Sequence, residues 1–426
     1  MNEQLKVLIV TEHASTKFGG EAALSLHYFR VMRNRGIPVW LITHARTRDE
    51  ISSLYPNDIN IVYIEDTAWH RAMWHIGKFL PHDVSYFTTG FLSRLSTQLS
   101  QRRVVRRLVR ECAINLIHQP MPVSPREPSM LFGFNVPVII GPMNGGMNYP
   151  PAFRSNRKGI QRLLIEIGRA SSTAMNVLIP GKRQAAALLV ANQRTRDALP
   201  SGVCTNIVEL VENGVDLTLW QPQMKLPDMP KGTPVTFAFM GRLVSWKAVD
   251  LLLYAFNKAR IQTPMRLCVI GDGPERVKLE ALASNLGITS SGTEGTVHFT
   301  GWLAQTDCAT YMQQADCLVL PSLHECGGAV VLEAMSMAKP VIATGWGGPL
   351  DYIDQSCGVL VAPESRNSII DGFAAAMVDM AKSQSIRQRM GAFGLAKVKK
   401  EYDWELKVDR ILDIYNNARN DFFVKI

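Results

Sequence analysis

Two glutamates around a glycine pair are the residues in this sequence best suited to chemistry. Glu325 and Glu333 have seven residues between them, and Gly327, Gly328 and Ala329 lie in that interval. An apolar run precedes this stretch and good helix formers follow it, so the pattern predicts a strand, a loop and a helix. The unpaired backbone N–H groups in the first turn of such a helix can hold a phosphate at the carboxyl edge of a parallel sheet.

The two carboxylates have two interpretations. Carboxylates accept hydrogen bonds from hydroxyl pairs, which a sugar or a ribose offers. In the other interpretation Glu333 is an exposed helix residue and Glu325 stabilises the helix dipole. Helix preferences alone do not explain why two glycines lie here, or why a glutamate lies on each side of them.

Two cations are expected at the same edge of the sheet. Arg242 and Lys247 follow the predicted strand Val235–Met240. Cations fixed in a crevice stabilise the negative charge that a leaving diphosphate gains in the transition state. An arginine and a lysine in a loop are otherwise ordinary solvated residues.

The spacing of these residues resembles a known family signature. Glu325 and Glu333, followed by the run Lys339–Thr344 and by Gly347 and Gly348, are similar to the signature of retaining glycosyltransferases of family 4, the glycosyl transferases group 1. The resemblance implies a GT-B fold of class α/β. Two Rossmann-like domains with doubly wound parallel sheets would face a central crevice, and a C-terminal helix would cross back to the first domain. Cys326 and Trp346 depart from the family pattern, which affects the expected sugar more than the fold.

The resemblance also assigns roles elsewhere. It makes the turn Gly271, Asp272 and Gly273 a border of the nucleobase pocket, although this is also a good turn after a strand. It makes His118, at the end of a predicted strand, a contact of the transferred sugar, whereas a lone histidine is more often structural. Both assignments are implied by the family and not by the spacing.

The first half of the chain offers candidates for substrate binding. Gly19 and Gly20 follow the buried strand Lys6–Val10 and precede a helical pattern, without the G-x-G-x-x-G fingerprint of dehydrogenases. Asn144 and Gly145 lie in a loop rich in glycine, asparagine and proline, which is either acceptor-binding or an ordinary surface loop.

The expected domains follow the restart of the strand and helix alternation. A proline-rich stretch at 221–232 marks the junction. We expect an acceptor-binding domain at 1–219, a nucleotide-sugar-binding domain at 220–402 and a C-terminal helix at 403–426.

Composition favours a soluble protein of two or three domains. The chain has 426 residues, of which 46% are hydrophobic and 19% charged, and its seven cysteines are scattered singly. This cysteine pattern is typical of a reduced, cytoplasmic protein. No apolar run approaches the roughly 18 residues of a membrane-spanning helix, and no leader is evident.

The net charge of +9 raises the question of a partner. We find no nucleic-acid-binding motif and expect no nucleic-acid partner. The densest basic cluster, in a predicted amphipathic helix, is Arg102, Arg103, Arg106, Arg107 and Arg110. This helix either holds the protein loosely at the inner face of the cytoplasmic membrane or is a solvated arginine face over a Val/Leu core stripe.

The sequence thus predicts a retaining hexosyltransferase. It would move a sugar from a UDP-, GDP- or ADP-sugar to a glycan or lipid-linked acceptor, in bacterial polysaccharide assembly. No cofactor and no metal are expected, because the D-x-D triplet is absent and Arg242, Lys247 and the helix dipole would replace the metal. The alternatives are a nucleotide-sugar-binding regulator without turnover and a GT-B epimerase or phosphorylase.

Overall fold

The computed structural model describes residues 4–80, 82–154, 171–222, 233–289 and 295–424. These residues form two compact units, of which unit 1 comprises Met1–Gly146, Arg157–Glu212 and Lys407–Ile426, and unit 2 comprises Met147–Asn156 and Asn213–Leu406. The predicted junction at 221–232 lies almost wholly outside the described residues. The predicted domain bounds therefore stay a prediction.

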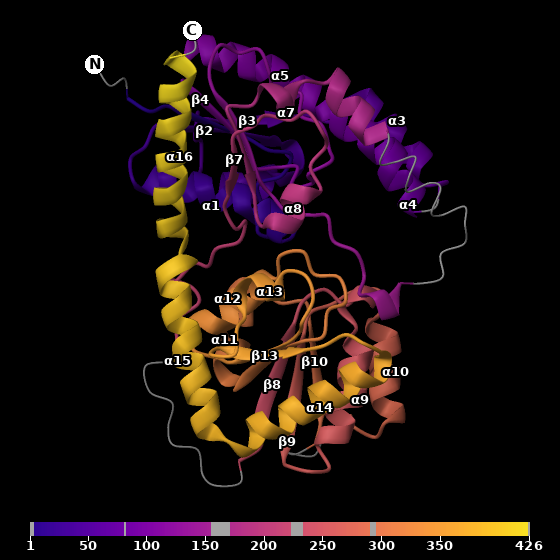
Figure 1. The fold of residues 1–426 in the computed structure, drawn as a ribbon. Coiled ribbons are helices and arrows are strands. Elements are labelled where there is room, and N and C mark those ends of the chain that lie inside the picture. The colour runs from indigo at the N-terminus through magenta and orange to yellow at the C-terminus, as the bar shows by residue number, and fades with distance from the viewer. Residues whose placement is uncertain (1–3, 81, 155–170, 223–232, 290–294, 425–426) are drawn as a thin grey trace. The chain divides into compact units, whose positions relative to one another are not determined.

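Unit 1 is built on a parallel sheet of seven strands in the order β3-β2-β1-β4-β5-β6-β7 (Figure 1). Short runs of branched apolar residues form these strands because both faces of the sheet are covered. The strands are β1 Val7–Val10, β2 Val39–His44, β3 Ile61–Ile64, β4 Leu116–Gln119, β5 Val138–Met143, β6 Ala187–Val190 and β7 Ile207–Glu209.

Unit 2 repeats the plan with a parallel sheet of six strands in the order β10-β9-β8-β11-β12-β13. In both sheets the order turns back on itself beside the first strand of the unit, which is the doubly wound arrangement that places ligand sites at the carboxyl edge. The strands are β8 Val235–Met240, β9 Met265–Ile270, β10 Val297–Gly301, β11 Cys317–Leu320, β12 Val341–Thr344 and β13 Gly358–Val361. The predicted α/β class with two Rossmann-like sheets is confirmed.

Helices connect the strands and cover the sheets. In unit 1 they are α1 Gly20–Asn34, α2 Arg48–Leu54, α3 Ala68–Gly77, α4 His82–Ser85, α5 Phe91–Glu111, α7 Gly181–Gln184 and α8 Gln193–Asp197. In unit 2 they are α9 Val249–Ala259, α10 Arg276–Asn285, α11 Gln305–Gln314, α12 Ala329–Ser336, α13 Pro349–Tyr352, α14 Arg366–Lys382 and α15 Gln384–Glu401. None of the helices in the described ranges is both long enough and apolar enough to cross a membrane.

The last helix returns the chain to unit 1. Helix α16, Trp404–Val424, begins in unit 2, and its residues from Lys407 onward belong to unit 1. Its Tyr415 is fully buried and its hydroxyl lies 2.6 Å from Nδ1 of His118 on β4. The predicted return of the C-terminal helix to the first domain is thus confirmed.

Candidate functional site

The candidate residues of unit 2 follow neighbouring strands of one sheet. Arg242 comes after β8, Asp272 after β9 and Glu325 after β11. The three strands are parallel neighbours, so their carboxyl ends lie along one edge of the sheet. Arg242 is exposed at this edge.

Lys247 and Glu325 form an ion pair that the sequence did not predict. The Nζ of Lys247 contacts Oε2 of Glu325, and their side chains are only 15% and 12% exposed. The loops that carry them are also joined by the backbone N–H of Leu323, which donates to the carbonyl of Trp246 at 2.8 Å. Low exposure strengthens this pair relative to one in bulk water, so the lysine is held in place at the sheet edge.

Helix α12 begins where the sequence predicts it. Gly328, the residue before the helix, has a φ of 79°, a left-handed conformation that glycine adopts without strain. The turn brings the N-terminus of an apolar helix beside Glu325, whose carbonyl accepts a hydrogen bond from the N–H of Gly348 at 2.7 Å. A Cβ on Gly348 would lie 2.2 Å from the carbonyl oxygen of Gly327. The two loops can therefore pack this closely only because residue 348 is a glycine.

Glu333 lies in the second turn of α12 and is partly buried. Burial raises the pKa of its carboxyl group to about 7. A carboxyl group with this pKa is about half ionised at neutral pH. Hydroxyl groups of a ligand that donate hydrogen bonds to it stabilise its ionised form. This environment is not that of a fully solvated helix residue.

Two buried hydroxyls at the same edge lack partners. Within the described residues, the Oγ of Ser322 and the Oγ1 of Thr344 are buried without a hydrogen bond. They lie just after β11 and at the end of β12, which are adjacent strands. Buried polar atoms of this kind are uncommon and mark places where water or a ligand completes the structure. Sequence reasoning missed both, although a Ser or Thr directly after an apolar strand was the available signal.

Trp346 has a defined contact within unit 2. Its ring N–H donates to the carbonyl of Asn148 at 2.7 Å, and the rings of Tyr149 and His324 lie 5.2 Å apart. The residue that departs from the family pattern therefore binds Asn148, close to where Tyr149 meets His324 of the loop that precedes α12.

The Asp272 side chain is used inside its own turn. Its Oδ1 accepts from the N–H of Gly273 at 2.7 Å, and its Oδ2 pairs with Arg276 at 3.1 Å. A Cβ on Gly271 would lie 2.0 Å from the carbonyl oxygen of Gly241, so this glycine allows two loops to pack. The predicted border of a nucleobase pocket stays a prediction.

His118 lies in the core of unit 1. The residue is fully buried, its Nε2 lies 2.6 Å from the carbonyl oxygen of Gly141, and its Nδ1 contacts Tyr415. Burial lowers its pKa to about 4, so the ring is neutral at pH 7. This geometry is that of a structural histidine, and it does not support the predicted contact with a transferred sugar.

The other candidates of unit 1 lie in two loops. Gly19 and Gly20 begin α1, and Gly19 has a φ of 98° with open space around the position of a Cβ. Asn144 is buried and donates to Oε1 of Glu212 at 2.5 Å, while the N–H of Gly145 donates to Oγ1 of Thr195 at 3.1 Å. Both of these groups are therefore engaged within unit 1, and their predicted role in acceptor binding stays untested.

Residues 227–393 match the family model described as glycosyl transferases group 1. This range includes Lys247, Glu325 and α12. This part of the chain belongs to that family. The chain is 32% identical over 260 residues to a D-inositol 3-phosphate glycosyltransferase of Nocardioides, which covers 55% of each protein. It is 31% identical over 188 residues to the lipopolysaccharide core biosynthesis glycosyltransferase LpsE of Rhizobium meliloti, covering 44% of this chain and 51% of that one. The chain thus spans about half the length of the curated relatives it matches.

Solved structures extend the likeness to the whole chain. HepE of Anabaena, solved in complex with UDP, superposes with a TM-score of 0.65 at 15% identity, covering 97% of this chain and 100% of that chain. The sucrose-phosphate synthase of Thermosynechococcus elongatus gives a TM-score of 0.66 at 18% identity, covering 97% and 98%. At these identities the likeness concerns the fold, which is GT-B.

Proposed function

We propose that this protein is a retaining glycosyltransferase that moves a hexosyl unit from a nucleoside diphosphate sugar to a glycan or lipid-linked acceptor. The observation that carries the proposal is the Lys247–Glu325 ion pair beside the N-terminus of α12, within the family-matched region. A cation and a helix N-terminus both attract a bound diphosphate. This attraction becomes stronger in the transition state, because the diphosphate gains negative charge as it leaves the sugar. Arg242 supplies a second cation at the same edge.

The proposed reaction needs no protein nucleophile. The bond between the anomeric carbon and the phosphate oxygen breaks, and its electron pair goes to the diphosphate. The acceptor oxygen forms a bond to the anomeric carbon on the same face, and its proton goes to the departing phosphate oxygen. Arg242, Lys247 and the helix dipole stabilise the leaving group, so we propose that the reaction is independent of metal and cofactor.

The two carboxylates, Glu325 and Glu333, contact different parts of the donor. Glu333 accepts hydrogen bonds from the ribose hydroxyls, and Glu325, fixed by Lys247, positions the transferred sugar. The names of the relatives support glycosyl transfer, and two of the similar structures, both of HepE, hold UDP-glucose or UDP with glucose. We propose that the donor of this chain is a UDP-, GDP- or ADP-sugar and that its setting is bacterial polysaccharide assembly.

One assay separates this proposal from the alternatives. The purified protein is incubated with a panel of UDP-, GDP- and ADP-sugars, and the products are followed by NMR. A transferase slowly releases the nucleoside diphosphate and a sugar with retained anomeric configuration, whereas an epimerase converts the donor into its epimer. Binding of a donor without any turnover would instead favour a regulator.

We further infer that unit 1 docks loosely on an anionic membrane surface. Arg103, Arg106, Arg107 and Arg110 on α5 are exposed, whereas Arg102 points inward and donates to the carbonyls of Met130 and Phe132. Exposed apolar side chains are Phe79 after α3 and, in the N-terminal half of α5, Leu92 and Leu99. Basic residues near an anionic leaflet contribute roughly 1 kcal/mol each, and exposed apolar residues add burial in the interface.

A further inference from the structure

The loop that joins β1 to α1 has a buried base and an exposed tip. Ala14 and Ser15, in the base, are fully buried, whereas residues 17–20, the tip, are exposed. Gly19, in the tip, has a φ of 98°, and Gly20 begins α1. Within the described residues, the position of a Cβ on either glycine is open space. Both glycines are predicted to bind a substrate, so the contacts that fix the tip bear on the proposed function.

A carboxylate from α2 holds this loop just before its tip. Oε1 of Glu50 accepts hydrogen bonds from the backbone N–H of Thr16 at 2.8 Å and from the Thr16 hydroxyl at 2.7 Å, and Oε2 accepts from the hydroxyl of Ser15. Burial opposes ionisation of Glu50, but the hydrogen bonds from Ser15 and Thr16 outweigh it, so the pKa of this carboxyl group lies below its ordinary value. Glu50 is therefore ionised at neutral pH and accepts all three hydrogen bonds.

Ser15 passes this constraint on to the tip. Its hydroxyl oxygen accepts from the backbone N–H of Lys17 at 3.0 Å and from that of Phe18 at 3.2 Å. A hydroxyl has one hydrogen and two lone pairs, and here Glu50 accepts the hydrogen. The lone pairs of the Ser15 oxygen are therefore turned toward the two N–H groups of the tip. Without Glu50 the hydroxyl is free to rotate, and these two hydrogen bonds lose their fixed acceptor.

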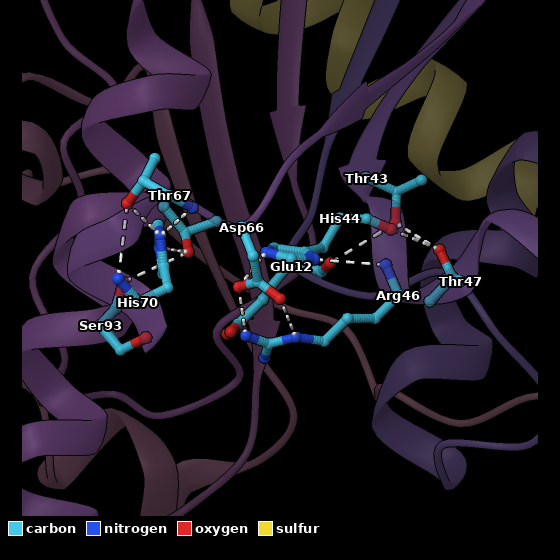
Figure 2. Close-up of polar contacts among 10 residues, drawn as sticks. Glu12, Thr43, His44, Arg46, Thr47, Asp66, Thr67, His70 and Ser93 are labelled. Carbon is cyan, nitrogen blue, oxygen red and sulfur yellow. Dashed lines mark hydrogen bonds and ion pairs between the residues drawn. The ribbon is translucent and has the colours of Figure 1, made fainter. Parts of the chain in front are cut away.

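The start of the same loop is fixed by separate contacts. The N–H of Ala14 donates to Oγ1 of Thr43 at 3.1 Å. Figure 2 shows Thr43, near the end of β2, beside Thr47, and their hydroxyl oxygens lie 3.1 Å apart. These contacts do not involve Glu50. Loss of the Glu50 carboxylate therefore releases the loop from Ser15 to the tip and leaves its start in place.

A purely structural role is the alternative for Glu50. It lies in the first turn of α2, where the helix dipole favours an acidic residue, and its neighbour Ile51 is buried. However, the hydrogen bonds of the Glu50 side chain go to Ser15 and Thr16, and no side chain caps the N-terminus of α2. These contacts favour the loop, and not the helix, as the part of the molecule that Glu50 organises.

We propose that Glu50 is a positioning residue for the proposed reaction. Through Ser15 and Thr16 it holds the backbone of residues 17–20 in the conformation that a substrate contacts, and it does not touch the substrate itself. A tip that is ordered beforehand does not have to be ordered when the substrate binds, so its contacts contribute more to turnover. This inference rests on the proposed transferase activity and on the predicted substrate binding by Gly19 and Gly20.

The test combines amide hydrogen exchange with kinetics of the full chain. Glu50→Ala should speed exchange in residues 15–20, leave exchange in β1 unchanged, and lower kcat/KM for nucleoside diphosphate release at least tenfold. Ser15→Ala should do the same, and the double variant should be no worse than Glu50→Ala, because both changes break one chain of contacts. Glu50→Gln keeps an oxygen for the N–H of Thr16 and should be at least threefold more active than Glu50→Ala. Asp49→Ala, which removes an exposed acid from the same helical turn, is the matched control and should behave as the wild type does.

Three results would overturn the inference. These are unchanged exchange of residues 15–20 in Glu50→Ala, unchanged kcat/KM in that variant, and an equal loss of rate in Asp49→Ala. A lower melting temperature of Glu50→Ala with unchanged kcat/KM would assign Glu50 a purely structural role. If Glu50→Ala does not fold, Ser15→Ala carries the same predictions. Absence of turnover in the wild type contradicts the proposed function itself, whereas normal wild-type turnover that Glu50→Ala leaves unchanged contradicts only this inference.

Discussion

At the scale of single residues, the ion pair of Lys247 with Glu325 explains how a cation stays at the sheet edge before any diphosphate arrives. Both partners are mostly buried, so the charge is preorganised and little is lost to solvent when the leaving group develops its own charge. Arg242 is exposed and has more freedom, which suits a group that closes on the phosphate from solvent.

Lys247→Ala and Arg242→Ala should each lower kcat/KM about a hundredfold, since losing one preorganised charge contact at a transition state costs on the order of 3 kcal/mol. Steady-state release of nucleoside diphosphate measures the effect. Lys278→Ala removes an exposed lysine of α10 and should leave the rate unchanged. Full activity in both Lys247→Ala and Arg242→Ala would contradict the proposal that these residues bind the donor diphosphate.

Glu325→Gln and Glu333→Gln should differ in their kinetic effects. Loss of a contact made equally in the ground and transition states raises KM, whereas loss of a contact to the reacting sugar lowers kcat. We therefore expect Glu333→Gln to raise the KM of the donor and Glu325→Gln to lower kcat. Equal changes of both parameters in both variants would contradict the division of roles.

The raised pKa of Glu333 gives a pH-dependent prediction. The folded value of about 7 lies above the ordinary 4.5, so this group favours folding fully below pH 4.5 and loses that contribution as the pH rises through 7. Relative to the wild type, Glu333→Gln should therefore gain about 1 to 3 kcal/mol of unfolding free energy between pH 5 and pH 8. Urea unfolding at the two pH values measures this, and a pH-independent difference would show that the carboxyl group titrates normally.

At the scale of elements, α16 and β4 are joined through the Tyr415 hydroxyl and His118. Tyr415→Phe should destabilise unit 1 by about 1 to 3 kcal/mol, because it leaves a buried ring nitrogen without a partner. If His118 is structural, kcat for donor hydrolysis stays unchanged below the melting temperature. A large fall in kcat with an unchanged melting curve would instead support the predicted contact of His118 with the transferred sugar.

Helix α5 shows how one pattern can serve two purposes. Its Val105 and Leu108 belong to the core of unit 1, as the solvated-face interpretation requires, yet four of its five clustered arginines are exposed. Sedimentation with vesicles of anionic lipid should carry down the wild type at low salt and not at high salt. Arg103, Arg106 and Arg110 changed together to glutamine should abolish binding, whereas the same sedimentation by this variant, or none by the wild type, would contradict membrane docking.

At the scale of the whole molecule, the alternation of apolar runs and helical patterns predicted the strands of unit 2 except β12, whose residues Val341–Thr344 were noticed only as part of a family signature. In unit 1 the short strand β3, with two of its four residues half-buried, gave too weak a pattern to be recognised. The arginine-rich part of α5 was predicted as a helix, whereas α3 was not recognised because aromatic residues and histidines interrupt its apolar periodicity.

The candidate site was predictable only in part. The glycine turn before α12 and both glutamates lie on short-range patterns that sequence reveals. The pairing of Lys247 with Glu325 joins residues 78 positions apart. Such long-range contacts depend on packing, which local patterns do not encode.

The most direct test of the central claim is equilibrium binding of nucleoside diphosphates to the full chain in the presence of a chelator. Isothermal titration with UDP, GDP and ADP should give saturable binding of at least one of them without metal, and Lys247→Ala should weaken it at least tenfold while Lys278→Ala leaves it unchanged. Binding of none of the three, binding that requires a divalent metal, or equal affinity in Lys247→Ala would contradict a diphosphate site at the edge formed by Lys247, Glu325 and α12.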